Sequence, residues 1–246
     1  MKKIVLFCLV ICYGTIGLSS PIDSSKTKIF VNKNPHPIKQ FYVATGAELI
    51  FSSGSLVSDS LAFETKWRFS FFPHVQQQYH YNFNKAIGFY TGFSIINLGF
   101  KNTAVTNDIN FELRQRSMSL GIPLALKLGS MKNGNFIALG ASAELMFHYK
   151  YKIYEDKKKS KQSDWLDPHM NLFNYALFID LRNKIGGYIR FKYYVNGFLA
   201  GVSNDFVLPV SGTAISFTPT TSSIFYISLG STFMKKKPRK LTLDDV

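Results

Sequence analysis

The chain has 246 residues, of which 46% are hydrophobic and 15% aromatic, a composition too apolar for a disordered protein. This length suits one large β domain or two smaller ones. Charged residues make up 18% of the sequence, below the roughly 25% of an average globular domain, so the folded surface is short of charge. The formal net charge of +14 indicates an anionic partner, either nucleic acid or anionic lipid.

The first 20 residues, MKKIVLFCLVICYGTIGLSS, predict a secretory signal peptide. Lys2 and Lys3 precede an apolar run, and small residues follow it. The alternative is a membrane anchor, but the run is short for a spanning helix and is interrupted by Tyr13 and Gly14. Export makes anionic lipid a better partner for a basic chain than nucleic acid.

Both cysteines lie within the expected signal peptide, so the mature chain would carry neither a disulfide nor a thiolate. Cys12 could mark a lipoprotein, but bulky Ile11 stands where lipoprotein signals have a small residue. Residues 21–39 form a polar, proline-bearing segment that is typical of a linker, here expected in the periplasm.

From residue 40 onwards, bulky apolar residues alternate with small or polar ones. Period two is the side-chain period of a β-strand. The clearest case is SMSLGIPLALKLG at residues 117–129. One further segment, residues 86–100, is apolar or small on both faces, and we expect Ile87, Phe89, Phe93 and Ile95 to face outwards. The other alternating segments are 40–51, 60–72, 135–150, 172–182, 186–195 and 223–234.

These segments predict an all-β fold, an eight-stranded antiparallel up-and-down transmembrane β-barrel over residues 40–235. A soluble barrel would have to enclose the bulky side chains of every strand, which would overfill an eight-stranded interior. With the apolar face in lipid, small and charged residues fill the lumen, where acids and bases must pair. The expected lumen charge network is Glu48, Glu64, Lys66, Arg68, Lys127, Glu144, Asp180, Arg182, Arg190 and Lys192.

The connections support this topology, because outer-membrane barrels alternate short periplasmic turns with longer external loops. Residues 130–135 and 182–184 are short connections, and 101–110, 152–170 and 196–222 are long ones. The segment 73–85 is long for a periplasmic turn, so the third strand is expected to begin earlier, with Tyr79, Tyr81 and Phe83 at the membrane interface. Further interface anchors are expected at Trp67, Tyr149, Trp165, Tyr175 and Tyr193. A bulge is expected at Pro123, which cannot donate to a strand ladder.

Three stretches carry a family resemblance: GFYTGFSIINLGF at 88–100, LGIPLALKLGS at 120–130 and YIRFKYYVNGFL at 188–199. They resemble the outer-membrane β-barrel proteins of Bacteroidota, a broad group that includes the PorT-like proteins. The resemblance implies an eight-stranded barrel in the cell outer membrane. PorT-like members are associated with protein secretion, and no functional residue carries over from the group.

No pattern of a catalytic, metal or cofactor site emerges from the sequence. The histidines, His36, His74, His80, His148 and His169, lack the spacing of zinc ligands. We therefore expect a non-enzymatic barrel, structural or partner-binding, linked to protein secretion or to cell-surface interaction. One alternative is a lipid-modifying enzyme that uses Ser163, Asp167 and His169, and another is a narrow pore.

Two basic clusters suggest contact with anionic lipid. Lys157, Lys158, Lys159 and Lys161 could bind lipopolysaccharide phosphates or could belong to a solvated loop. The basic tail at 236–246 is expected in the periplasm, either near the inner leaflet and cell wall or unstructured. The expected partners are outer-membrane lipid, lipopolysaccharide and an unidentified protein, with no nucleic acid.

Overall fold

The computed structural model describes residues 40–234, apart from the side chains of residues 71–73 and 234. The expected signal peptide (1–20), linker (21–39) and basic tail (236–246) lie outside the described residues. All regular structure in the described part is β-strand. No helix there is long and apolar enough to cross a membrane.

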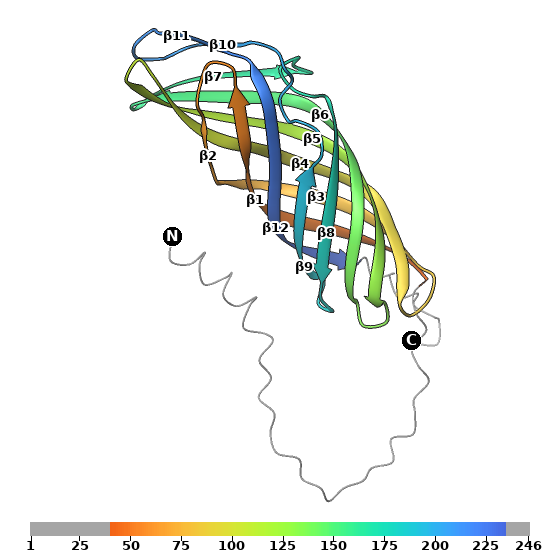
Figure 1. The fold of residues 1–246 in the computed structure, drawn as a ribbon. Coiled ribbons are helices and arrows are strands. Elements are labelled where there is room, and N and C mark those ends of the chain that lie inside the picture. Colours follow the sequence, from red (N-terminus) through yellow and green to blue (C-terminus); the bar gives the residue numbers. More distant parts are fainter. Residues whose placement is uncertain (1–39, 235–246) are drawn as a thin grey trace, which may run out of the picture. The chain divides into compact units, whose positions relative to one another are not determined.

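Eight strands form a closed antiparallel ring, so the predicted eight-stranded up-and-down barrel is confirmed (Figure 1). Each ring strand pairs with its neighbours along the chain, and the first pairs with the last to close the ring. The ring strands are β1 (Phe41–Ser58), β3 (Arg68–Asn82), β4 (Ile87–Thr106), β5 (Ile109–Ser130), β6 (Asn135–Glu155), β8 (Phe173–Arg182), β9 (Gly187–Tyr194) and β12 (Pro219–Met234).

Four shorter strands lie at the end of the ring where the long connections are (Figure 1). β2 (Glu64–Lys66) pairs with β4, and β7 (Lys158–Trp165) pairs with β6. β10 (Asn204–Val207) and β11 (Ala214–Phe217) form a separate hairpin.

The ring is uneven in height. β4, β5 and β6 have 20, 22 and 21 residues, whereas β8 and β9 have 10 and 8. At about 3.3 Å per residue, the long strands measure about 70 Å and the short ones about 30 Å. The loop-end parts of β4, β5 and β6, together with β7, therefore form a wall that rises above the rest of the ring, and we call this the tall wall.

Bulky apolar side chains point outwards around the ring. Leu124, Leu139 and Phe191 are 60%, 47% and 45% exposed, and the residues between the outward positions of β5 are buried. Monomeric soluble proteins rarely expose a continuous apolar band of this kind, whereas lipid tails solvate it. The ring therefore has the surface of a transmembrane barrel, and we call this band the lipid belt.

The connections at the other end are uniformly short. They cover residues 83–86, 131–134 and 183–186, and Gly134 and Gly186 supply the positive φ angles of 74° and 88° that two of these turns need. The expected early start of the third strand is wrong, because residues 73–82 belong to β3, the second strand of the ring.

Two expected loops are instead continuations of strands. Residues 101–110 form the tip of the β4–β5 hairpin, whose turn residues Asn107 and Asp108 have φ angles of 46° and 59°. Residues 152–165 form the β6–β7 hairpin. Asn and Asp tolerate the left-handed backbone region better than most residues, which explains the position of the first turn.

A β-bulge in β6 reverses which residues face inwards. Met118 pairs with His148 and Ser119 with Met146, so Phe147 has no partner on β5. Tyr149, expected as an outward interface anchor, therefore points inwards and is buried. The bulge expected at Pro123 is absent. The β4–β5 pairing is interrupted between Thr91 opposite Leu124 and Ser94 opposite Gly121, but neither strand has an extra residue across this gap.

Apolar residues, rather than polar ones, fill the loop end of the ring. Side chains from the last long connection pack against inward residues of the tall wall, and we call this cluster the apolar cap. The predicted small, polar interior therefore describes only the half of the ring nearer the short turns. The apolar cap includes Phe100, Phe111, Leu113, Ile153, Phe198, Leu199, Phe206, Leu208, Ile215 and Phe217.

Candidate functional site

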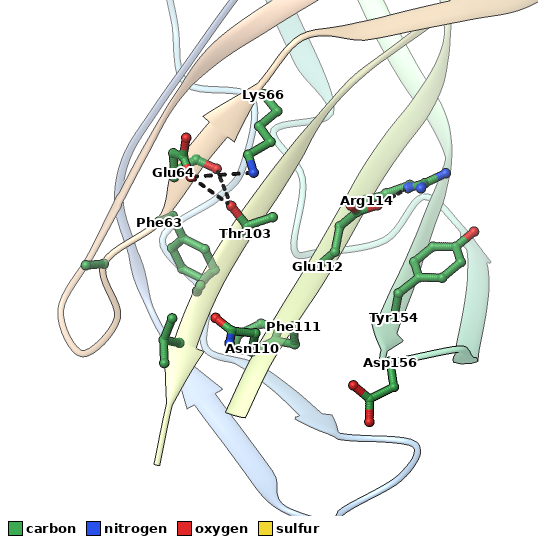
Figure 2. Close-up of a pocket in the computed structure, with 13 residues that line it drawn as sticks. Phe63, Glu64, Lys66, Thr103, Asn110, Phe111, Glu112, Arg114, Tyr154 and Asp156 are labelled. Atoms are coloured by element: carbon green, nitrogen blue, oxygen red, sulfur yellow. Dashed lines mark hydrogen bonds and ion pairs between the residues drawn. The ribbon is translucent and has the colours of Figure 1, made fainter. Parts of the chain in front are cut away.

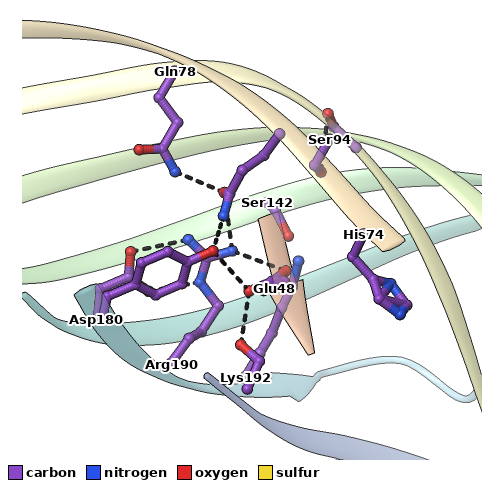
Figure 3. Close-up of polar contacts among 12 residues, drawn as sticks. Glu48, His74, Gln78, Ser94, Ser142, Asp180, Arg190 and Lys192 are labelled. Atoms are coloured by element: carbon purple, nitrogen blue, oxygen red, sulfur yellow. Dashed lines mark hydrogen bonds and ion pairs between the residues drawn. The ribbon is translucent and has the colours of Figure 1, made fainter. Parts of the chain in front are cut away.

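Asp180 on β8 is the centre of a buried polar network inside the ring. Its Oδ1 accepts a hydrogen bond from Arg190 Nε at 2.6 Å, and its Oδ2 accepts one from an Arg190 terminal nitrogen at 2.9 Å. Arg182 and Tyr90 also donate to Oδ2, at 3.1 and 2.6 Å. Figure 3 shows Asp180 and Arg190 pointing toward each other. The buried carboxylate therefore has the partners that offset its loss of hydration.

Glu48 on β1 extends the network across the lumen. Its Oε2 accepts hydrogen bonds from Ser228 at 2.7 Å and Tyr188 at 3.2 Å, and its Oε1 lies 3.5 Å from Arg190. Gln76 on β3 donates to Tyr188 and accepts from Arg190 at 3.3 Å. β3 and β9 are not neighbours in the ring, so these bonds tie opposite walls together.

A second buried carboxylate, Glu144 on β6, lies nearer the loop end. It pairs with Lys192 of β9 and accepts hydrogen bonds from Tyr194 at 2.8 Å, Ser119 at 3.0 Å and Ser142 at 3.3 Å. Each of these partners is buried, so the pair is satisfied without water.

Lys127 is bound differently from the other buried cations. Its Nζ donates to Asn82 Oδ1 at 2.6 Å and lies 3.4 Å from His80 Nδ1. The rings of Tyr42 and Phe136 lie 5.3 and 5.4 Å from the same nitrogen. Amide, imidazole and aromatic faces thus replace a carboxylate around this ammonium group.

Three members of the expected charge network lie elsewhere. Glu64 and Lys66 are exposed, with side chains 74% and 47% accessible, and they contact each other at 3.6 Å. The expected continuous strand 60–72 is wrong, because β2 pairs with β4 at the edge of the tall wall and β3 starts only at Arg68. Arg68 is half-buried and donates to Asn97 Oδ1 at 2.9 Å, between β3 and β4.

The network fills the lumen. Tyr90, Lys127, Asp180 and Tyr226 project from four different strands and are each 0% exposed. A channel that admitted water would leave polar side chains on its wall accessible. The arrangement therefore fixes the distances between strands and offers no continuous aqueous path.

The hairpin β10–β11 closes the loop end of the ring. Phe217 packs against Phe63 with ring centres 4.8 Å apart, and Phe206 packs against Tyr151 at 4.7 Å. Glu155, at the tip of β6, accepts backbone N–H bonds from Val210 at 2.5 Å and Ser211 at 3.0 Å. This contact connects the tall wall to the turn of the hairpin.

The residues considered for a lipid-modifying enzyme do not assemble a catalytic triad. His169 Nδ1 lies 2.6 Å from Asp167 Oδ1, which also accepts the His169 backbone N–H at 2.8 Å. Ser163 lies on β7 opposite Lys150, and within residues 40–234 no hydrogen bond joins a serine hydroxyl to His169. The same part of the chain contains no group of three His, Cys, Asp or Glu side chains able to hold a metal ion.

The lysines expected to contact lipid are divided between two faces of the tall wall. Lys158 pairs with Glu155, whereas Lys159 and Lys161 pair with Tyr154 and Lys152 on the outward face. Lys157 lies in the turn. A groove of about 880 Å³ lies beside this outward face, with Glu64, Lys66, Thr103, Arg114 and Tyr154 among its lining residues (Figure 2).

Comparison with known proteins gives only structural likenesses. No protein-family model matches the chain, and no curated protein matches its sequence. Ail, the attachment invasion locus protein of Yersinia pestis, is 10% identical, covering 78% of this chain and 99% of Ail, with a TM-score of 0.35. Neisserial surface protein A is 11% identical, with 78% and 97% coverage and a TM-score of 0.32. Ail in complex with the heparin analogue sucrose octasulfate gives 13% identity, 77% and 99% coverage and a TM-score of 0.28. With values this low, the fold assignment depends on the strand pairing of the chain itself.

Proposed function

We propose that this chain is a non-enzymatic outer-membrane protein whose filled barrel holds a rigid platform for partner binding at the cell surface. The observation that carries the proposal is the contrast between the two faces of the ring. Outward positions form the lipid belt, and inward positions form a bonded polar network. An expected signal peptide at residues 1–20 would direct the chain to export.

The orientation follows from the lengths of the connections. Phe41 and Met234, the ends of the first and last strands, lie at the same end of the ring as the short turns. Short turns face the periplasm in outer-membrane barrels, and long loops face outwards. The tall wall and the apolar cap are therefore the parts that we expect outside the cell.

Cell-surface interaction accounts for this architecture better than transport does. The apolar cap and the hairpin β10–β11 give the loop end a packed core of its own, which holds the connections in one arrangement. The filled lumen leaves no path for a secreted chain. A link to protein secretion would therefore have to act through a surface of the barrel and not through its lumen.

Cell fractionation and gel mobility test the proposed location. We expect the chain in the outer-membrane fraction after alkaline carbonate washing, and we expect unheated samples to migrate differently from boiled ones. A protease site inserted between Asn107 and Asp108 should be cut in intact cells, since that turn lies at the tip of the tall wall. A soluble periplasmic pool, or protection of the inserted site in intact cells, would contradict the proposal.

A further inference from the structure

A row of five cations crosses the outward face of the tall wall and β2. Strand pairing places one basic residue of each strand directly opposite the next, and directly opposite residues share one face of a sheet. The buried positions of Leu113 and Ile153, next to Arg114 and Lys152, show that this face points away from the apolar cap. The cation row is Lys66, Lys101, Arg114, Lys152 and Lys161.

A second basic pair lies nearer the lipid belt, where Arg116 and Lys150 are directly opposite each other. Acidic residues neutralise only one side of the face. Glu64 pairs with Lys66, and Glu112 pairs with Lys101 at 2.6 Å and with Arg114. Within residues 40–234, no carboxylate lies at ion-pair distance from Arg116, Lys150, Lys152, Lys159 or Lys161.

This arrangement costs folding stability. Like charges placed directly opposite each other on neighbouring strands repel. Burial, followed by the nearby Arg116, holds the pKa of both Lys150 and Lys152 below the usual range of a lysine. Among the described residues, no carboxylate pairs with Arg116, Lys150 or Lys152, so an anion from outside is the natural complement to this side of the face.

The height of the cations above the lipid belt indicates where that anion lies. On β5, Leu120 is the last residue of the lipid belt, and Met118 follows in a row with His148 and Trp165. Trp165 is 71% exposed, as expected of an aromatic residue at a membrane interface. Arg116 lies about 13 Å beyond Leu120 along the strand, which a tilt of 35–45° reduces to about 10 Å along the bilayer normal.

The outward face thus changes from hydrocarbon-facing leucine to interfacial aromatics and then to cations within a few residues. The same order of layers is found in a bilayer leaflet, from acyl chains to phosphate groups. The groove beside Arg114 lies further from the lipid belt and is lined by Glu64, Glu112 and Asp156 as well as by cations, so it is not part of this basic site. A phosphorylated headgroup at the membrane surface fits the order of layers below it.

We propose that the outward face of β4–β7 binds the phosphorylated sugar headgroup of an outer-leaflet glycolipid, with Arg116, Lys150 and Lys152 at its phosphates. The proposal rests on the proposed outer-membrane location. Arginine suits a phosphate through paired donors, and lysine suits it as a point charge. The row of Met118, His148 and Trp165 directly below the cations, with Trp165 as an interfacial aromatic residue, favours a lipid headgroup over a soluble polyanion.

Retention of lipid A by the full chain tests the site. The chain is embedded in phosphatidylcholine nanodiscs containing bisphosphorylated lipid A, extracted into mild detergent, and the co-purified lipid A is quantified. Changing Arg116→Gln, Lys150→Gln and Lys152→Gln together should lower the retained lipid A at least tenfold. The control changes Lys85→Gln, Lys132→Gln and Lys184→Gln, which remove the same charge from the short turns, and retention should fall less than twofold.

The other outcomes are equally decisive. The unchanged chain should retain dephosphorylated lipid A no better than the triple variant retains bisphosphorylated lipid A. Equal retention of the two lipids by the unchanged chain would overturn the proposal. A loss in the control as large as in the triple variant would overturn it too. If a soluble sulfated polysaccharide displaces lipid A at equal concentration, the face binds a soluble polyanion instead.

The same experiment separates the two proposals. An unchanged chain that fails to enter nanodiscs as a species with heat-dependent gel mobility refutes the membrane barrel itself. A chain that enters them without preferring phosphorylated lipid A refutes only the headgroup site. Lys150→Gln alone is the milder variant, and an intermediate loss of lipid A is expected from it.

Discussion

Asp180 shows how much one buried side chain contributes to this barrel. It accepts bonds from two arginines and from Tyr90, so removing its charge leaves Arg182 and Arg190 buried with too few acceptors. We expect Asp180→Asn to lower the free energy of unfolding by about 3–5 kcal/mol. Urea titration followed by the unheated gel band measures this, and a change below 1 kcal/mol would count against a stabilising network.

Lys127 provides the opposite case. No carboxylate lies at ion-pair distance from its ammonium group within residues 40–234, and apolar rings surround part of it. Burying a charge without a counter-charge is unfavourable, and an apolar group of similar length removes that cost. Lys127→Met should therefore leave the free energy of unfolding unchanged or raise it. The same urea titration applies, and a loss as large as that of Asp180→Asn would show that the bond to Asn82 is essential.

Gly230 leaves room for a bonded tyrosine. A Cβ at this position would lie 2.2 Å from the Tyr188 ring, whose hydroxyl donates to Glu48. Gly230→Ala should force that ring away and lower the free energy of unfolding by about 1–3 kcal/mol. Gly201→Ala is the matched control, because the nearest atom to its added Cβ is 3.7 Å away. Equal stability of the two variants in thermal gel-shift assays would show that the ring moves freely.

At the level of elements, Glu155 holds the hairpin β10–β11 to the tall wall. Burial raises the pKa of Glu155, but the N–H bonds from Ser211 and Val210 outweigh it and hold the pKa below the usual range. The contribution of this contact is therefore complete above about pH 4.3, and it is lost as the pH falls through the lower folded pKa.

Hydrogen exchange at the Val210 and Ser211 amides measures this contact. The protection factors, which correct for the slower intrinsic exchange of amides in acid, should fall as the pH drops, and Glu155→Gln should show lower protection at pH 7 with a weaker dependence on pH. Asp156→Asn, one residue further along, is the control, because the hairpin amides bond to Glu155 and not to it. Identical pH profiles for Glu155→Gln and the unchanged chain would exclude the contact as the cause.

The cation row makes a prediction whose sign depends on the lipid. Lys152 faces Arg114 on one neighbouring strand and Lys161 on the other. Without anionic lipid, Lys152→Gln should raise the free energy of unfolding by about 0.2–1 kcal/mol, because repulsion is relieved. With lipid A present, it should lower the stability instead. Thermal gel-shift curves in both lipids give the answer, and the same sign in both would argue against an anionic ligand at this face.

Alternation alone predicted most of the elements and faces correctly. Leu124 and Leu139 face outwards and Asp180 inwards, because period two needs no knowledge of the partner strand. The break at Phe147 was not predictable, because a bulge depends on the register of β5 against β6. The separation of β2 from β3 was not predictable either. It depends on the pairing of β2 with β4, whereas residues 64–66 alternate in the sequence as those of any strand do.

The lumen network was only partly readable from the sequence. Charges opposite an apolar face marked Glu48, Glu144 and Arg190, but neutral partners such as Gln76 and Tyr90 carry no comparable signal. The apolar cap was missed for a related reason, since its residues come from loops and from strands apolar on both faces. Apolar inward positions at 96, 98 and 100 were the available hint.

At the scale of the whole molecule, the filled lumen predicts that the barrel does not conduct ions. Side chains from opposite walls bond to each other, and Tyr90, Asp180 and Tyr226 are 0% exposed. Planar-bilayer recordings of the purified chain should show no steady conductance under conditions in which a porin conducts. Stepwise ohmic currents that persist at low voltage would show that the polar network opens.

Because Phe147 has no partner on β5, the outward side chains of β6 have odd numbers below it and even numbers above it. Odd-numbered residues of this strand meet acyl chains below it, whereas even-numbered ones such as Lys150 and Lys152 meet the exterior above it. Deleting Phe147 would close the bulge and leave every other side chain on its present face, because Met146 and His148 already pair with Ser119 and Met118. If Phe147 were instead drawn into regular pairing, the upper half of the strand would turn by one side chain, with Lys150 and Lys152 pointing into the apolar interior and Tyr149 and Ile153 pointing outwards. The extra residue Phe147 thus allows a single strand to present apolar side chains to lipid and basic side chains to the exterior above the lipid.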